Sequence, residues 1–291
     1  MEQALPRDGW RLKFSYLALG IAVFAVIWFM AAALGTRFGL WDFRFSFGTL
    51  LRGLGPYVAG AAVISSVVAL ILSLVASPRK KPFIIGLLAT LVSAMLSFRL
   101  YALLLSVGLI GDGPPIPPIH NIQTDWSNEV YFSEELLEVR GPDSNPVVSG
   151  EEAVFFNPDS EAWGGKTLAK IQEDAEFNPA VDDDPDDKPY GTLEPLILDA
   201  APEMVFAAAE RLVKRRGWTV VTSDADAGTL EATHTSTWFG FKDDVAIRFL
   251  AEGEGTRVDM RSVSRVGVSD LGANAKRISL FLNDLGGQRY D

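Results

Sequence analysis

The chain has 291 residues, a net charge of −11 and no cysteine, so disulfide bonds, thiolate nucleophiles and zinc–sulfur sites are excluded. Its charges are divided unevenly. Residues 1–111 carry ten Lys and Arg against three Asp and Glu, whereas residues 112–291 carry sixteen against thirty-four, a net charge of −18. Such an acidic second part argues against binding to nucleic acid and against lying flat on anionic lipid.

The first 111 residues contain three apolar runs, at about 14–34, 55–76 and 82–110. Each run reaches the ~20 residues that a helix needs to cross a bilayer. We therefore predict that residues 1–111 form a membrane anchor with three transmembrane helices. Arg99 interrupts the third run. It either serves a function inside the membrane or extends to the outer interface beside Tyr101.

Basic residues in the short loops predict the orientation of this anchor. Six of them precede the first run or separate the second run from the third: Arg7, Arg11, Lys13, Arg79, Lys80 and Lys81. Because cytoplasmic loops are enriched in Lys and Arg, these six predict a cytoplasmic N-terminus. Three spans then predict that the remaining chain lies outside the cytoplasm. In a bacterium this describes a multi-pass protein of the inner (plasma) membrane with a periplasmic C-terminal domain.

Residues 112–192 are predicted to be a proline-rich linker and an irregular acidic segment that packs on the domain. Consecutive prolines at 111–118 favour a semi-rigid, extended chain. Turn pairs such as Asn145-Pro146 follow, and aromatic residues such as Trp163 favour packing on the domain over a free segment. The acidic run at 182–187 lacks the calcium-loop pattern of an EF-hand, so we interpret it as a solvated loop.

From residue 193 the pattern becomes regular and predicts an α+β domain, residues 193–291. Pro202 suits the first turn of a helix that Gly217 ends, and a C-terminal helix has apolar residues at i, i+3, i+4 and i+7 from Ile278. Strands are predicted at 196–198, 218–223, 229–238, 243–252 and 257–265. The order β-α-β-β-β-β-α predicts an antiparallel sheet with helices packed on one side, a helix-grip-like layer.

The last two strands are predicted to pair as a hairpin with Gly253-Glu254 as its loop. Arg248 then lies opposite Asp259. Side chains alternate between the two faces of a strand, so one face of the hairpin is apolar and the other carries a lattice of opposite charges. The apolar face is expected to lie against the C-terminal helix.

Several runs of this sequence also support a family resemblance. They are PPIH at 117–120, Thr124-Asp125, Pro195-Leu196, GTLEAT at 228–233, TWFGFKDDVAIR at 237–248 and VDMRSVSRVGVSDLGANAKRI at 258–278. Over roughly residues 115–287 the chain resembles the family of uncharacterised domains catalogued as domain of unknown function fourteen ninety-nine. The resemblance implies a membrane-linked or exported bacterial protein, with relatives in plastids and no established activity. The family usually has Ile-His-Asp where this chain has Ile119-His120-Asn121.

The two histidines are the first candidates for chemistry. His120 follows the linker, and Asp125 could form with it a His–carboxylate pair for acid–base work or for binding one metal ion. One of three further acids could complete the pair: Asp243, Asp244 or Asp270. The alternative is that His120 only hydrogen-bonds its loop to the sheet. His234 alternates with the apolar residues of its strand and is interpreted as a core histidine.

Arginine and aspartate residues of the last two strands and the C-terminal helix form the second group of candidates. Guanidinium groups near a helix N-terminus could bind an anion; the alternative is an ion-pair lattice that joins the hairpin to the last helix. Trp238 is interpreted as a core residue or as the apolar wall of a site for a lipid-like or aromatic ligand. The ligand-binding candidates are His120, Asp125, Trp238, Asp243, Asp244, Arg248, Arg261, Arg265, Asp270, Asn274 and Arg277.

Our leading functional hypothesis is a non-catalytic envelope protein whose α+β domain binds a partner protein or a small amphiphilic or anionic ligand. No nucleophile elbow, P-loop or dinucleotide-binding fingerprint is present in the sequence, and we predict no cofactor and no metal ion. One alternative is a periplasmic hydrolase, with or without the assistance of a metal ion, that uses His120 and Asp125 with nearby acids. Another is an assembly or scaffold subunit of a membrane complex.

Overall fold

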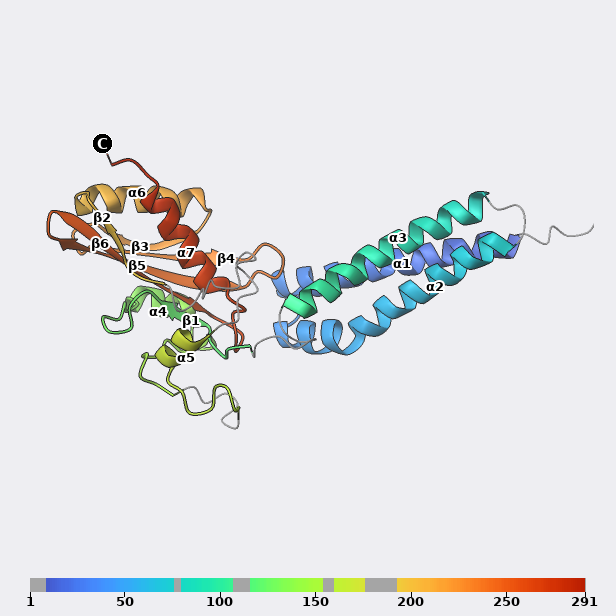
Figure 1. Ribbon diagram of the computed structural model, residues 1–291, viewed down its shortest axis with the longest axis horizontal. Coiled ribbons are helices and arrows are strands. Elements are labelled where there is room, and N and C mark those ends of the chain that lie inside the picture. Colours follow the sequence, from blue (N-terminus) through green and yellow to red (C-terminus); the bar gives the residue numbers. More distant parts are fainter. Residues whose placement is uncertain (1–8, 76–79, 107–115, 154–159, 176–192, 291) are drawn as a thin grey trace, which may run out of the picture. The chain divides into compact units, whose positions relative to one another are not determined.

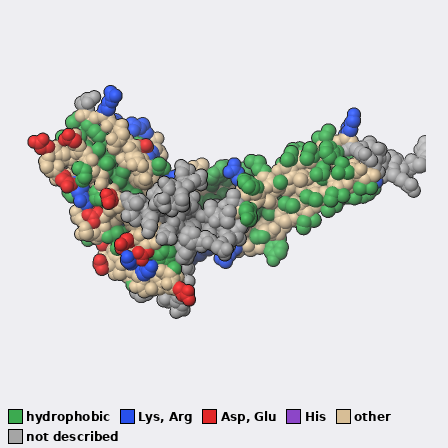
Figure 2. All heavy atoms as spheres, viewed as in Figure 1, with side chains coloured by type: hydrophobic (Ala, Val, Ile, Leu, Met, Phe, Trp, Pro, Cys, Tyr) green, Lys and Arg blue, Asp and Glu red, His purple; other side chains and the backbone are tan. Residues whose placement is uncertain are grey.

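The computed structural model describes residues 9–75, 80–106, 116–153, 160–175 and 193–290. The chain divides into two compact units, one that holds three long helices and one that holds a sheet with shorter helices (Figure 1). Hydrophobic side chains are spread along the visible surface of the helical unit, whereas acidic side chains are scattered over the α+β unit (Figure 2). The acidic run at 182–187 lies outside the described residues.

The helical unit consists of α1 (Gly9–Arg37), a π-helix η1 (Phe45–Leu54) that leads into α2 (Gly55–Val75), and α3 (Lys80–Ser106). Within the described residues these give three candidate membrane spans, Gly9–Arg37, Phe45–Val75 and Lys80–Tyr101. The prediction of three long apolar helices is confirmed. The second helix, α2, begins at Gly55 as predicted, although the candidate span that contains it begins at Phe45 because η1 precedes it. Residues 107–110 of the third predicted run lie outside the described residues.

Small side chains allow the three long helices to pack closely. Buried alanines of α1, α2 and α3 meet in one cluster: Ala18, Ala22, Ala69 and Ala89. The hydroxyl groups of Ser66 and Ser93 hydrogen-bond between α2 and α3 at 2.8 Å. Interfaces of this kind are typical of helices that associate within a bilayer. Arg99 lies on the exposed surface of α3, away from these contacts.

The described part of the α+β unit forms a six-stranded antiparallel sheet. Its strands are β1 (Asn121–Gln123), β2 (Leu196–Leu198), β3 (Thr219–Asp224), β4 (Thr229–Thr235), β5 (Lys242–Glu252) and β6 (Gly255–Ser264). The spatial order is β1-β6-β5-β4-β3, and β2 pairs with the first half of β6 beside β1. The predicted hairpin register is confirmed, since Arg248 lies opposite Asp259.

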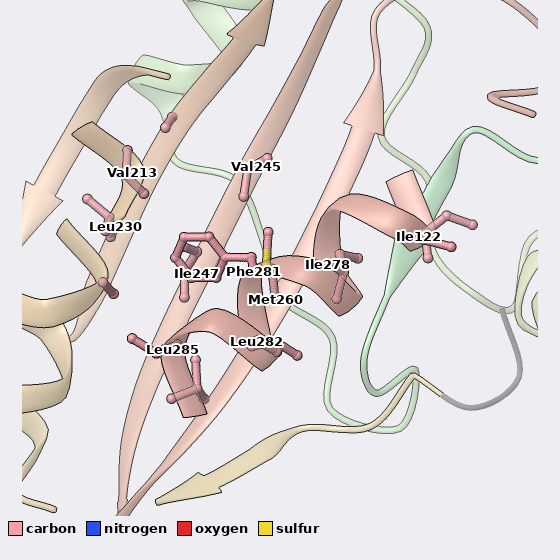
Figure 3. Close-up of a cluster of buried hydrophobic side chains, with 14 of the residues drawn as sticks. Ile122, Val213, Leu230, Val245, Ile247, Met260, Ile278, Phe281, Leu282 and Leu285 are labelled. Carbon is pink, nitrogen blue, oxygen red and sulfur yellow. The ribbon is translucent and has the colours of Figure 1, made fainter. Parts of the chain in front are cut away.

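Two helices cover one face of this sheet, α6 (Pro202–Arg215) and α7 (Ala273–Gly286) (Figure 1). From residue 193 onward the observed order, β2-α6-β3-β4-β5-β6-α7, agrees with the predicted β-α-β-β-β-β-α order and α+β class. Val245, Ile247 and Met260 of the sheet pack against Ile278 and Phe281 of α7 (Figure 3). The apolar face of the hairpin is therefore buried under the C-terminal helix, as the period-two pattern predicted.

The other face of the sheet lies against α4 (Glu134–Arg140) and the segment before it (Figure 1). Val130, Phe132 and Leu136 pack there against Ala246 and Val263. The sequence predicted irregular chain for this segment, but its described part contains β1, α4 and α5 (Leu168–Asp174). Both short helices begin at a hydroxyl N-cap, Ser133 for α4 and Thr167 for α5.

Trp238 differs from its core interpretation. The predicted strand 229–238 ends at Thr235, and Trp238 lies in the turn between β4 and β5 with 60% of its surface exposed. The alternation of β4 therefore does not continue into the turn, so its inward-facing pattern gives no information about this side chain.

Two hairpin glycines provide a matched test of the fold. Gly228 and Gly253 both adopt φ near +65°, at +65° and +63°. A Cβ on Gly228 would lie 2.5 Å from the carbonyl oxygen of Phe249, whereas one on Gly253 would meet nothing within 4 Å. We expect Gly253→Ala to destabilise the domain by about 1 kcal/mol through its backbone conformation alone. Gly228→Ala should cost about 3 kcal/mol because the backbone must also move.

Thermal unfolding of both variants of the full chain in detergent would measure the difference. Equal losses of stability would show that the close approach of Gly228 to β5 is unimportant.

Candidate functional site

Two consecutive aspartates of β5 point to opposite faces of the sheet. Asp243 shares its face with Val245 and the core beneath α7, and Asp244 shares the other face with Ala246 and α4. The candidate residues therefore do not form one site. They form separate polar clusters on the two faces, and each cluster can be described from its own contacts.

The Asp244 cluster consists of Asp244, Arg140, Arg265 and Thr233. Asp244 is fully buried, and its carboxylate accepts hydrogen bonds from Arg140 at 2.5 Å and from two nitrogens of Arg265 at 2.9 Å each. The Thr233 hydroxyl donates at 2.6 Å. Both guanidinium groups are also nearly buried. This carboxylate therefore has no capacity left for a ligand, and its role is to hold α4 and β6 to β5.

The Asp259 cluster consists of Asp259, Arg248, Arg257 and Asp125. Asp259 is fully buried and pairs with Arg248 at 3.1 Å and with Arg257 at 2.9 Å. Arg257 also pairs with Asp125 at 2.6 Å. Hydrogen bonds from Ser127 lower the pKa of Asp125, and Arg257 lowers it further. Asp125, a proposed partner of His120, is thus bound to an arginine at the far end of β1 from His120.

Arg261 lies between these two clusters and is 1% exposed. It donates hydrogen bonds to Asn121 at 3.0 Å, to the carbonyl of Val130 at 2.8 Å and to that of Val148 at 2.5 Å. Glu129 lies 3.5 Å away. Burial lowers the pKa of Arg261 to about 10, and the charge of Glu129 opposes that shift. Arg261 therefore ties the segment 121–148 to the sheet and does not face a ligand.

The Arg277 cluster, on the face beneath α7, consists of Arg277, Asp243, His234, Asn274 and Ser262. Arg277 donates to Asp243 at 2.5 Å and to Ser262 at 2.9 Å, and it also hydrogen-bonds Asn274. The Nδ1 atom of His234 lies 3.1 Å from Arg277 and 3.5 Å from Asp243. The side chain of His234 is 31% exposed, so this cluster reaches the surface at its imidazole.

His234 is therefore a correction to its interpretation as a core histidine. It faces the covered side of the sheet, as the alternation predicted, but near the end of β4 that side is incompletely covered. The pairing register of β4 and β5 was the signal that could have identified its partner. His234 lies directly opposite Asp243 across β4 and β5, which the length of the intervening turn could have indicated. Arg140 and Glu129 were also missed, because the sequence predicted only that their segment packs on the domain and not which of its residues contact the sheet.

His120 lies just before β1. Its Nδ1 atom is 3.2 Å from the carbonyl oxygen of Val268, and its Nε2 atom has no hydrogen-bond partner among the described residues. Burial lowers the pKa of His120 below its usual value. This contact matches the alternative in which the imidazole holds its loop to the rest of the domain. His120 and Asp125 are not brought together.

Asp270 and Asn274 lie at the start of α7. The carboxylate of Asp270 accepts hydrogen bonds from the backbone N–H groups of Gly272 and Asn274, both at 3.0 Å. The side chain of Asn274 donates to the carbonyl of His120 and to the Ser264 hydroxyl. Asp270 therefore caps the start of α7, and Asn274 fixes the helix to the sheet. Within the described ranges, no three His, Cys, Asp or Glu side chains are grouped so that they could hold a metal ion.

These observations define an α+β domain whose buried charges bind one another, in a chain that also has three candidate membrane spans. Residues 170–285 match the model of a family described as protein of unknown function (DUF1499). The chain thus carries a DUF1499 domain, as the resemblance indicated. The matched region runs from α5 to α7 and leaves out β1 and α4. No curated protein matches the chain.

The Asp244 cluster predicts a large effect from a small change. Asp244→Asn keeps the shape of the side chain but leaves Arg140 and Arg265 buried without a counter-ion. Breaking a buried ion pair in this way costs about 3–5 kcal/mol. Chemical unfolding of the full chain in detergent would measure it. As a control, Lys214→Ala removes an exposed pair with Glu210 and should cost less than ~1 kcal/mol. Similar losses in both variants would contradict a structural role for Asp244.

The Arg277 cluster predicts a dependence of stability on pH. Burial alone would raise the pKa of Asp243, but hydrogen bonds from His234 and Ser264 and the charge of Arg277 lower it to about 2. The ionised carboxylate therefore stabilises the fold above pH ~4, and this contribution, roughly 2 kcal/mol, is lost as the pH falls from ~4 to ~2. Asp243→Asn should lower stability at pH 7 and flatten this part of the pH profile.

Equilibrium unfolding at several pH values would compare Asp243→Asn with the wild type, and Glu254→Gln in the exposed β5–β6 turn is the control. An unchanged acid limb in Asp243→Asn would disprove the assignment.

Proposed function

We propose that this chain is a multi-pass protein of a bacterial inner membrane, with its N-terminus in the cytoplasm and its α+β domain in the periplasm. There the domain binds a partner protein or a small amphiphile and carries out no catalysis. The basic residues before the first span and between the second and third spans support this orientation. The charged candidate residues pair with one another and are thereby occupied, which supports a binding role over a catalytic one.

That pairing is the observation on which the proposal depends. Asp244 and Asp259 are fully buried, and each is held by two arginines. Arg261 and Arg277 are likewise occupied by acceptors of the domain itself. An anionic ligand at these arginines would have to displace the carboxylates or, at Arg261, the amide and carbonyl oxygens that already satisfy them. An apolar or amphiphilic partner on the domain surface therefore suits this geometry better than an anion in its interior.

The segment from Tyr131 to α4 offers apolar side chains to such a partner. Tyr131 is 77% exposed, and Leu137 of α4 is exposed as well. Tyrosine is enriched at protein interfaces because its ring buries apolar surface while its hydroxyl remains able to hydrogen-bond. We therefore place the proposed partner on the α4 side of the domain. The hydrolase alternative needs His120 beside a free carboxylate, and Asp125 and Asp244 are both bound to arginines.

Photocrosslinking in living cells tests the proposal. A benzophenone amino acid would replace Tyr131, with replacement of the exposed Leu280 of α7, on the opposite face of the sheet, as a control. We expect a reproducible adduct with one protein or lipid at position 131 and none at position 280. The adduct should contain the partner chemically unchanged. Conversion of a bound molecule that is lost in His120→Ala would overturn the proposal in favour of a hydrolase.

The orientation is checked in the same cells. The chain has no cysteine, so single-cysteine variants report one position each. Glu254→Cys should react with a membrane-impermeant maleimide in spheroplasts, and Lys81→Cys should react only after permeabilisation. The reverse pattern would place the domain in the cytoplasm.

A further inference from the structure

One end of the sheet, which we call the entry end, collects three segments. They are His120, the turn 236–241 between β4 and β5, and the loop 265–272 between β6 and α7. Thr235 pairs with Lys242 at the base of the turn. The Ser264 N–H donates to the carbonyl of His120 at 2.9 Å, and the Arg265 N–H donates to that of Lys242 at 2.9 Å. The chain that arrives from α3 therefore joins the domain at the same end as the Trp238 turn.

The two ends of the sheet differ in charge. At the far end, the turns 224–228 (DADAG) and 252–255 (EGEG) carry four carboxylates and no basic residue. At the entry end, the turn 236–241 (STWFGF) carries no charged residue. The loop 265–272 adds Arg265, which is bound inside the Asp244 cluster, and Asp270, which accepts the first N–H groups of α7. Apart from Lys242, which is exposed at the base of the turn, these entry-end segments therefore carry fewer exposed charges to desolvate than the far-end turns.

Exposed apolar side chains gather at the same end. Trp238 is 60% exposed, and Val268 of the loop 265–272 is exposed as well. Val139 lies beside this loop, because its carbonyl accepts a hydrogen bond from Arg265 at 2.7 Å, and its side chain is also exposed. Tryptophan is enriched where a membrane meets water, since its apolar ring and its N–H group suit the headgroup layer.

The length of the connecting chain limits which end can reach a bilayer. Nine residues separate Ser106, at the end of α3, from Ile116. Even fully extended, they span at most about 35 Å. The eleven residues of β5 extend a further ~36 Å from the entry end to the far end. A domain that approached the bilayer by its far end would therefore need nearly the whole reach of the connection and would bring four carboxylates to the lipid.

We propose that the entry end rests on the bilayer surface on the domain's own side, with Trp238 inserted between the headgroups and the acyl chains. The partner of this surface is a phospholipid bilayer. The inference requires that the three candidate spans cross the membrane, but it does not depend on a protein partner. An end-on contact of this kind is compatible with the strongly acidic composition of the domain, because the carboxylates of the far end point away from the lipid.

Lipid-borne quenchers test this contact directly. The full chain, which contains no cysteine, would carry a single NBD label at Trp238→Cys or, as a matched control, at Glu254→Cys in the far-end turn. Both variants would be reconstituted in nanodiscs of phosphatidylethanolamine and phosphatidylglycerol that contain shallow nitroxide lipids. We expect strong loss of NBD fluorescence at position 238 and no loss at position 254. An unquenched label at 238, or equal quenching at both positions, would overturn the proposal.

A second variant guards against an effect of removing Trp238 itself. Val268→Cys labels the same end and leaves the tryptophan in place, so its NBD group should also be quenched. Combining it with Trp238→Ala should reduce that quenching if Trp238 holds the end in the lipid. Quenching at 268 that does not change in the double variant would show that Trp238 is not the inserted residue. The experiment contains only purified protein and lipid, so its outcome is separate from that of the crosslinking test.

Discussion

The burial of Arg261 is the constraint on which the α+β unit depends. A guanidinium group has five N–H donors, and leaving a buried charge without partners is very costly. Arg261 finds its acceptors on Asn121, Val130 and Val148, which precede it by 113 to 140 positions in the chain. The strand β6 can therefore occupy its place only together with this early segment. The segment in turn covers the Asp244 and Asp259 clusters and keeps water from them.

The alternation of β5 and β6 separates the charged residues into independent groups. Asp243 and Asp244 are neighbours in sequence but lie on opposite faces, each with its own arginine partners. The arginine and aspartate residues that look in the sequence like one anion site thus form two separate structural ion-pair clusters, one beneath α7 and one beneath α4. Such clusters contribute little net stability over well-packed apolar residues, yet losing one member is expensive. They specify how the helices pack on the two faces of the sheet. Recognition of a partner or ligand therefore falls to residues on the domain surface.

The sequence predicted the sheet well because its signals were local. The period-two alternation of the last two strands, the glycines of the β5–β6 turn and the apolar stripe from Ile278 each concern neighbouring residues. The covering of the charged face could not be predicted in this way. Arg140 and Glu129 reach the sheet, and Asn121 of β1 reaches Arg261, through contacts over a hundred positions away, and no period in the sequence records such contacts. Trp238 was misjudged because a strand pattern was extended into a turn.

The pairing of β6 has a practical consequence for producing the domain alone. One edge of β6 is occupied by β5, while the other is shared by β2 and β1 in succession. A recombinant fragment that starts at residue 170, where the family match begins, would lack β1 and open the second half of that edge. Unpaired backbone groups on an open edge recruit other chains. Such a fragment would self-associate, whereas one that starts upstream of residue 116 keeps the edge closed and is the better candidate for crystallisation.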